Sequence, residues 1–343
     1  MDAARPGADS SSKHATIVGS VPQNQLIPLP VVLGPTGSGK SDLSLCIARA
    51  LGAEIVNCDS LQVYRGFDIG AAKVPPAERQ GVPHYLIDIV EPTDLFTAGD
   101  YARVAEAAIR EISARGRTVV LVGGTGFYLR GLLEGLSPGP ARDAILRGRL
   151  LEKEQMRPGI LHRLLARLDP ASAARIHPND KNKTMRALEV RLLEKAPVSS
   201  MFERGRSPLS GFLPVKIGLD PPRDLLYARL NERARRMFDP DLFNQSASKV
   251  SLVDEVRGLL SAGVPPQAKP FESLGYKQVL QMLEGRITGE QALESTQLET
   301  RRYAKRQLTW FRKEQGVRWI AGFGDDPQVQ TEALAILQPA GAA

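Results

Sequence analysis

The residues best suited to carry chemistry lie near the start of the sequence, where residues 34–41 read GPTGSGKS and match the phosphate-loop pattern G-x-x-x-x-G-K-[ST]. The glycines let backbone N–H groups converge on an anion, Lys40 adds a positive charge, and Ser41 offers a hydroxyl to Mg²⁺. An apolar strand pattern precedes the motif over residues 29–33, and helical apolar spacing follows it over residues 42–51. This context favours a phosphate-binding loop over a glycine-rich turn without a ligand, but such a loop does not name a reaction.

Two aspartates belong to apolar runs further along the chain. Asp59 ends a predicted buried strand that starts at residue 53, and Asp88 lies within a predicted third strand over residues 84–90. Ligands of open α/β sheets bind beyond the carboxyl ends of the strands, so Asp59 can reach whatever the phosphate loop holds. It could equally cap the next turn. Asp88 is the second-choice carboxylate.

The loop between these strands carries two cations of undecided role. Arg65 and Lys73 could contact phosphate, or they could be solvated loop charges. A helix is predicted over residues 97–115, with Gly116 ending it, and a fourth strand over residues 118–122. Glycines directly after that strand bring the backbone close to a ligand.

Alternation of strands and helices predicts an α/β fold with a mainly parallel sheet. We expect residues 1–27 to form a disordered tail, because they are rich in Ser, Ala, Pro and Gly and lack an apolar signal core. Residues 28–136 and 208–322 form the α/β core with basic C-terminal helices, and residues 137–207 form a helical insertion. The order of the tail, residues 323–343, is left open.

Composition limits the class of protein. The chain has 343 residues, a net charge of +7 and 42% hydrophobic residues, as expected for a globular protein with an anionic partner. Two cysteines and the absence of metal-ligand spacing favour a reducing, cytoplasmic compartment over a disulfide or zinc scaffold. No apolar run is long enough to span a bilayer, and no feature indicates more than a monomer.

Basic residues gather in two regions, within the insertion and over residues 300–313. They could be solvated helix faces, but their clustering favours a surface that binds a polyanion. In the second region Trp310 and Phe311 alternate with cations, as on nucleic-acid-binding faces, and one of them could also enter the core of an amphipathic helix.

Seven motifs in this order and spacing are specific beyond the phosphate loop alone. They are GPTGSGKS (34–41), NCDSLQVYRGFDIGAAK (57–73), LVGGTGFYLRGLLEGL (121–136), RIHPND (175–180), RALEV (186–190), SLGYKQ (273–278) and KRQLTWFR (305–312). With them the chain resembles bacterial tRNA dimethylallyltransferases, also called tRNA isopentenyltransferases, from about residue 31 to residue 320.

The resemblance implies a P-loop NTPase-like core and transfer of a dimethylallyl group from its diphosphate to the exocyclic amine of the adenine 3′ of the anticodon. Asp59 matches the general base, Thr36 the residue at the breaking bond, and Arg233 an arginine that grips the diphosphate. Mg²⁺ is the implied cofactor, with Ser41 as its ligand. The implied diphosphate-binding residues are Gly34, Pro35, Thr36, Gly37, Ser38, Gly39, Lys40 and Ser41.

The resemblance also implies contacts to the tRNA anticodon stem-loop, gripped by the insertion. The implied tRNA-binding residues are Asp59, Ser60, Leu61, Gln62, Thr125, Arg147, Asn182, Lys183, Thr184, Met185, Arg186, Glu272, Ser273, Leu274, Gly275, Tyr276, Lys277, Lys305, Arg306, Gln307, Trp310 and Arg312. The sequence departs from the family where Lys183 replaces a common arginine and where the polar segment 239–249 is longer than usual. It also lacks the C-terminal zinc-finger pattern of eukaryotic relatives.

Three other functions remain open from the sequence. A P-loop kinase of a small metabolite would explain the phosphate loop and Asp59, but it would not need the basic regions. A prenyltransferase acting on free adenine nucleotides would not need the basic C-terminal helix. An RNA-binding module with a vestigial nucleotide site would bind tRNA without transferring a prenyl group.

Overall fold

The computed structural model describes residues 26–136, 139–140, 142–195, 207–239 and 250–338. Within this part of the chain, six parallel strands form one sheet in the order β3-β2-β4-β1-β5-β6. The strands are β1 (Ile27–Leu33), β2 (Glu54–Asn57), β3 (His84–Tyr85), β4 (Val119–Gly123), β5 (Phe212–Asp220) and β6 (Val317–Ala321). The prediction of an α/β fold with a parallel sheet is confirmed.

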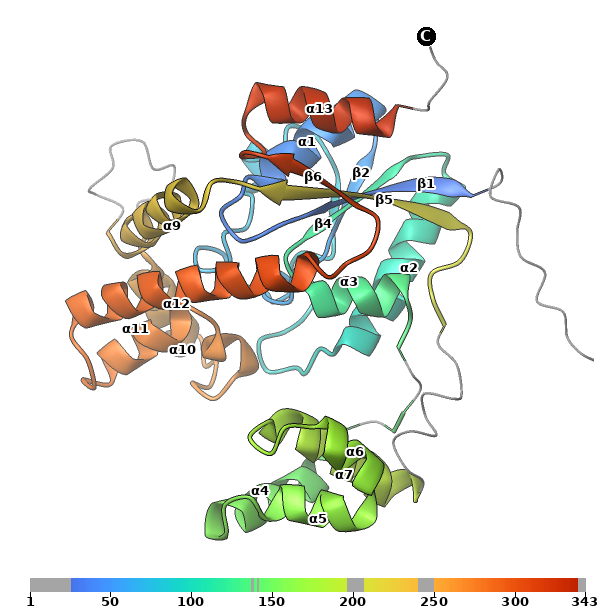
Figure 1. Cartoon of the computed structure of the whole chain (residues 1–343). Helices are drawn as coiled ribbons and strands as arrows, with labels where there is room; N and C mark the ends of the chain where they lie inside the picture. Colours follow the sequence, from blue (N-terminus) through green and yellow to red (C-terminus); the bar gives the residue numbers. More distant parts are fainter. Residues whose placement is uncertain (1–25, 137–138, 141, 196–206, 240–249, 339–343) are drawn as a thin grey trace, which may run out of the picture.

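The central strand β1 reads IPLPVVL, and its last five residues are buried. A near-continuous apolar run is typical of a parallel strand that is covered on both faces. Val31 and Leu33 point into one core with α2 (Ala98–Ala114) and α3 (Gly126–Leu133), whereas Val32 points into another with α1 (Lys40–Leu51). Figure 1 shows these helices on opposite sides of the sheet. The sheet and the helices on its two faces therefore fix the position of the loop between β1 and α1.

The predicted strand over residues 84–90 is wrong after its first two residues. Only His84 and Tyr85 pair with β2. Leu86 and Asp88 have φ angles of 63° and 57°, which an extended strand does not allow. The backbone then turns so that the N–H groups of residues 89–90 bond to Val63 O.

A second group of helices packs beside the carboxyl ends of the strands. It contains α9 (Arg223–Phe238), α10 (Leu252–Ser261), α11 (Tyr276–Leu283) and α12 (Gly289–Phe311). A short 3₁₀ helix, η4 (Lys269–Glu272), precedes α11. Outside this group, a second 3₁₀ helix, η2 (Pro76–Glu78), precedes β3. The apolar cluster of the helical group includes Phe67 and Val63 from the loop after β2 together with Phe271 and Tyr276. That loop is therefore fixed against the helices rather than extended into solvent.

The insertion contains α4 (Ala144–Met156), α5 (Ile160–Leu168), α6 (Pro170–Arg175) and α7 (Lys181–Glu194). Leu150, Leu165 and Leu188 form the centre of its own hydrophobic core. In Figure 1 these four helices, in green, make a lobe apart from the sheet.

The chain after β6, whose order the sequence leaves open, forms α13 (Pro327–Leu337). Val329 and Ala333 on this helix are buried in the same core as α1. The predicted N-terminal tail up to residue 25 and residues 240–249 of the polar segment lie outside the described residues.

Candidate active site

The phosphate loop curls between β1 and α1. Gly37 and Gly39 have φ angles of 78° and 82°, in the region that glycine adopts without strain. Space also requires glycine here, because an added Cβ would lie 2.6 Å from Leu230 Cδ2 at residue 37 and 2.6 Å from Gly324 N at residue 39. The loop is therefore packed from both sides and presents a preformed backbone.

Two cations meet at this loop. Lys40 donates a hydrogen bond to Pro35 O at 2.7 Å, and Arg233 from α9 donates to Thr36 Oγ1 at 2.8 Å. Burial lowers the pKa of Lys40 to about 8, opposed by Asp59 and reinforced by Arg233. Burial also lowers the pKa of Arg233 to about 10, reinforced by Arg229 and opposed by Asp59. Both cations are thus held where a polyanion would stabilise them.

Asp59 directly follows β2 and is partly buried. Its Oδ1 accepts the N–H groups of Leu61 at 2.8 Å and Gln62 at 3.3 Å, so it caps the next turn as one reading of the sequence proposed. Oδ2 accepts no hydrogen bond from the described residues and stays available to a substrate. The capping and chemical roles are therefore compatible.

Thr125 joins the ends of β2 and β4. Its Oγ1 accepts the Ser60 N–H at 3.0 Å, and its own N–H donates to Cys58 O at 3.2 Å. At Gly123 an added Cβ would lie 2.0 Å from Cys58 O, so the two strand ends are in close backbone contact. This contact fixes the turn that carries Asp59.

A cavity of about 810 Å³ brings these groups together. Thr36, Lys40, Ser41, Asp59 and Arg233 all line it, although they come from the loop after β1, the start of α1, the turn after β2 and α9. Residues 272–275 and α12 close its other side. The sequence-predicted catalytic residues therefore share one space.

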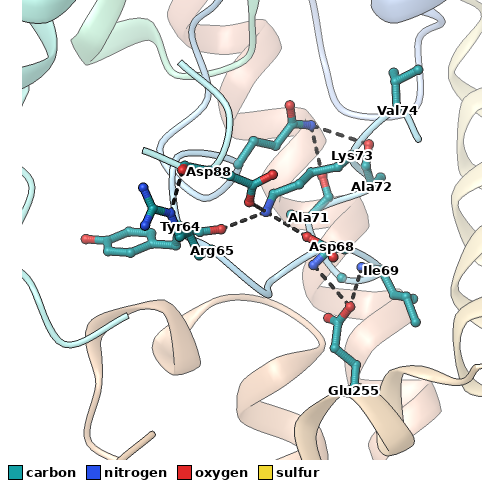
Figure 2. A network of polar contacts seen from close by, with 12 residues as sticks. Tyr64, Arg65, Asp68, Ile69, Ala71, Ala72, Lys73, Val74, Asp88 and Glu255 are labelled. Carbon is teal, nitrogen blue, oxygen red and sulfur yellow. Dashed lines mark hydrogen bonds and ion pairs between the residues drawn. The ribbon is translucent and has the colours of Figure 1, made fainter. Parts of the chain in front are cut away.

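The loop after β2 is held by charges that do not face the cavity. Figure 2 shows the Lys73 ammonium bonded to Tyr64 O, Asp68 and Asp88. The Lys73 side chain is only 5% exposed, so neither a phosphate contact nor a solvated charge describes it. Asp88 is paired and does not line the cavity, which removes it as the second-choice carboxylate. Arg65 pairs with Glu91 at 2.5 Å.

Glu255 of α10 is a structural residue of this region that sequence reasoning missed. It accepts the N–H groups of Ile69 at 2.7 Å and Asp68 at 3.1 Å (Figure 2). It also accepts a hydrogen bond from the hydroxyl of Tyr276. No local motif marks it, because its partners lie far away in the sequence.

The residues expected to contact tRNA fall into three groups by exposure. Half-buried side chains are Asp59, Leu61, Gln62, Thr125, Arg147, Arg186, Ser273 and Leu274. Exposed side chains that leave the surface available are Asn182, Lys183, Glu272, Lys277, Lys305, Arg306, Trp310 and Arg312. Thr184, Met185, Tyr276 and Gln307 are buried. Phe311 is 1% exposed beside the exposed Trp310, so α12 has both the core face and the surface aromatic that its sequence allows.

Arg147 and Arg186 of the insertion share one partner. Both bond to the fully buried Glu189, at 3.0 Å and 2.7 Å. Although burial raises the pKa of Glu189, the hydrogen bonds from these arginines bring it below its ordinary value. Neither arginine lines the cavity. The pair therefore stabilises the helical lobe and leaves part of each guanidinium at its surface.

Acidic and histidine side chains do not gather as a metal centre. Within the described residues, no three His, Cys, Asp or Glu side chains are placed to hold a metal ion together. Likewise, the described helices include none that is long and apolar enough to cross a bilayer.

A parallel sheet with a phosphate loop after its central strand and a carboxylate lining the same cavity is the arrangement of a P-loop-like protein that binds a phosphorylated ligand beyond the carboxyl ends of its strands. The family model "IPP transferase" matches residues 62–314. The chain belongs to this family of prenyltransferases.

Relatives support this assignment over most of the chain. The tRNA dimethylallyltransferase of Solibacter usitatus is 54% identical over 308 residues, covering 90% of this chain and 97% of that protein. That of Koribacter versatilis is 47% identical, covering 90% and 97%. Among solved structures, the tRNA isopentenylpyrophosphate transferase of Bacillus halodurans is 35% identical, with a TM-score of 0.64 and coverage of 90% and 95%. A eukaryotic dimethylallyltransferase acting on tRNA is 26% identical, with a TM-score of 0.71 and coverage of 86% and 74%.

Proposed function

We propose that this protein transfers a dimethylallyl group from dimethylallyl diphosphate to the exocyclic amine of the adenine 3′-adjacent to the anticodon of tRNA, releasing diphosphate. The observation that carries the proposal is that Lys40, Arg233 and Asp59 line one cavity. The relatives named tRNA dimethylallyltransferase support tRNA as the acceptor. They give no support to a metabolite kinase or to a prenyltransferase of free nucleotides.

The phosphate loop acts on the leaving group. The bond between the allylic carbon and the diphosphate oxygen breaks, and its electron pair stays on the diphosphate. Negative charge then grows where Lys40, Arg233 and the loop N–H groups converge. Because the Thr36 hydroxyl accepts a hydrogen bond from Arg233, its own proton can be donated to the diphosphate oxygen at the breaking bond.

Asp59 acts on the nucleophile. The adenine nitrogen forms the new bond to the allylic carbon and gives a proton to Asp59 Oδ2, while Oδ1 stays bonded to Leu61 N–H. An exocyclic amine is a poor nucleophile, so holding both substrates in one cavity supplies much of the rate. The target base must leave the stack of the anticodon loop to enter, as other base-modifying enzymes require.

Mg²⁺ fits this site as a partner of the diphosphate. Ser41 lines the cavity, while the described residues lack a cluster of carboxylates. Mg²⁺ commonly keeps several waters and uses few protein ligands beside substrate phosphates. The Ser41 hydroxyl would hold it, and the ion would supply positive charge to the leaving group.

The exposed face of α12 is the proposed path of the tRNA. Lys305, Arg306 and Trp310 combine cations with an aromatic ring, which suits a nucleic-acid backbone and a stacked base. The exposed Asn182 and Lys183 on α7 would grip the stem-loop from the insertion. We further propose that the protein acts as a monomer in the cytoplasm. Light scattering after size-exclusion chromatography would test its oligomeric state.

Mass spectrometry of tRNA nucleosides after incubation with dimethylallyl diphosphate and Mg²⁺ tests the function. We expect prenylated adenosine only when tRNA, donor and enzyme are all present. Equal prenylation of free AMP would favour the nucleotide-acting enzyme. Phosphoryl transfer from ATP to a metabolite, without prenylated tRNA, would favour the kinase. Salt-sensitive tRNA binding without transfer under any condition would favour the binding module.

A further inference from the structure

Gln307 lies on α12 among residues expected to face RNA, yet its side chain is only 6% exposed. Both ends of its amide bond to the protein backbone. Its Oε1 accepts the Thr36 N–H at 2.8 Å, and its Nε2 donates to Gly124 O at 2.8 Å. One side chain thus joins the phosphate loop to the loop after β4, across 271 and 183 residues of sequence.

These two bonds act on backbone next to the proposed catalytic groups. With its N–H turned to Gln307, Thr36 places its hydroxyl against Arg233 at 2.8 Å. On the other side, Gly124 precedes Thr125, whose Oγ1 holds the turn after Asp59. Gln307 therefore bonds to two backbone segments of the site. One is the phosphate loop that would hold the diphosphate, and the other is the loop whose Thr125 fixes the turn carrying Asp59.

A larger residue at Gly124 would displace the amide of Gln307. An added Cβ there would lie 2.4 Å from Gln307 Nε2, and 3.8 Å from Lys40 Nζ. The helix that carries this amide packs against α9, which supplies Arg233, and against α3 (Figure 1). Its position is set by the same packing that sets the cavity wall.

We propose that Gln307 is a positioning residue for the diphosphate, which sets the backbone of Thr36 and the distance from the phosphate loop to the loop after β4. The proposal deepens the proposed function, since the diphosphate is that of the prenyl donor. The affinity of the phosphate loop for any diphosphate would depend on Gln307, whether or not tRNA is the acceptor. The competing role is a direct contact to tRNA.

Titration calorimetry with inorganic diphosphate and Mg²⁺, without RNA, tests the proposal. Gln307→Met keeps the length of the side chain and removes both hydrogen bonds, and we expect diphosphate affinity to fall about tenfold. The kcat for prenyl transfer should fall at least as much, while the tRNA affinity and its salt dependence stay unchanged. Gln297→Met is the matched control, because Gln297 also lies on α12 and donates to a backbone carbonyl, Asn231 O, but neither residue lines the cavity.

Gly124→Ala is a second variant, which tests the same contact even if Gln307→Met fails to fold. Its methyl group would push the far end of Gln307 aside and should reproduce the loss of diphosphate affinity. In the double variant the two losses should not add, because both act on one contact. Unchanged diphosphate affinity in Gln307→Met, fully additive losses, or weaker binding of tRNA in the absence of diphosphate would each overturn the proposal. If the variants lose diphosphate affinity as expected but the parent protein prenylates no tRNA, the proposed function alone would be overturned.

Discussion

Replacing Lys40 by methionine should stabilise the ligand-free protein while removing its affinity for diphosphate. Burial lowers the pKa of Lys40 from an ordinary value of 10.5 to about 8, so its charged form is disfavoured in the folded state. Methionine keeps the apolar length of the side chain without the charge. The same residue is then a cost to folding and a requirement for binding, as is common at functional sites.

The size of the effect follows from the displaced pKa. A tenfold change in an equilibrium constant is worth ~1.4 kcal/mol, so the displacement costs the folded state at most ~3 kcal/mol at neutral pH. Lys40 is only partly buried, and its replacement also removes the bond to Pro35 O, worth ~1 kcal/mol. We therefore expect a net gain of ~1–2 kcal/mol, or ~1–3 °C in Tm for a chain of this length.

The pH dependence has a definite sign. Between about pH 8 and pH 10.5 the unfolded chain binds more protons at Lys40 than the folded protein, so the stability of the parent protein rises with pH across this window. The cost is present in full below this window and absent above it. The Tm gap between the variant and the parent should therefore be largest near neutral pH and shrink as the pH rises towards 10.5.

Thermal unfolding with and without inorganic diphosphate measures both effects. Diphosphate should raise the Tm of the parent and leave that of Lys40→Met unchanged. Lys153→Met, at an exposed lysine of α4, is the control and should behave like the parent in both conditions. A variant that is less stable than the parent near neutral pH, or a Tm gap that does not shrink at alkaline pH, would refute the reasoning.

Three further changes separate the roles of the site. Asp59→Asn keeps an oxygen for the Leu61 N–H but cannot take the proton, so transfer should fall at least ~100-fold with tRNA binding intact, as single-turnover mass spectrometry and filter binding would show; near-normal turnover would exclude the general base. Lys305→Ala should weaken tRNA binding and reduce the slope of log affinity against log salt by ~0.7–0.9, and an unchanged slope would remove it from the contact surface. Glu255→Ala leaves two backbone N–H groups and the Tyr276 hydroxyl without their acceptor and should cost about 2–4 kcal/mol in urea unfolding, with Glu255→Gln nearer the parent; an equal midpoint for Glu255→Ala and the parent would contradict this.

The phosphate loop and Asp59 could be predicted from the sequence because their signals are local. A continuous motif sets the conformation of the loop between β1 and α1. A carboxylate directly after a buried parallel strand must lie at the carboxyl edge of the sheet, where ligands bind. The same logic fails at residues 84–90, where the apolar run predicts a strand. There Leu86 and Asp88 take positive φ angles, and Asp88 pairs with the buried Lys73, a contact that the apolar run does not reveal.

Other parts of the site depend on contacts that no local pattern encodes. Gln307 stands in a basic motif that suggests an RNA contact, and only the packing of α12 reveals its bonds to Thr36 and Gly124. Arg147 and Arg186 likewise belong to a cationic run, but folding of the insertion brings them to one buried Glu189. Charge type is visible in a sequence, whereas the partner of each charge is a property of the tertiary structure.

The backbone after β6 has a consequence for anyone who shortens or extends this chain. Gly324 N–H donates to Ser38 O at 2.9 Å, and Asp325 pairs with Arg229 at 2.8 Å, one helical turn before Arg233. The side of the phosphate loop that carries Ser38 is thus covered by the segment at Gly324, which lies nearly three hundred positions downstream. A truncation placed after the last strand, chosen to trim an apparently dispensable end, would remove that cover and weaken anion binding without altering any residue that touches the anion.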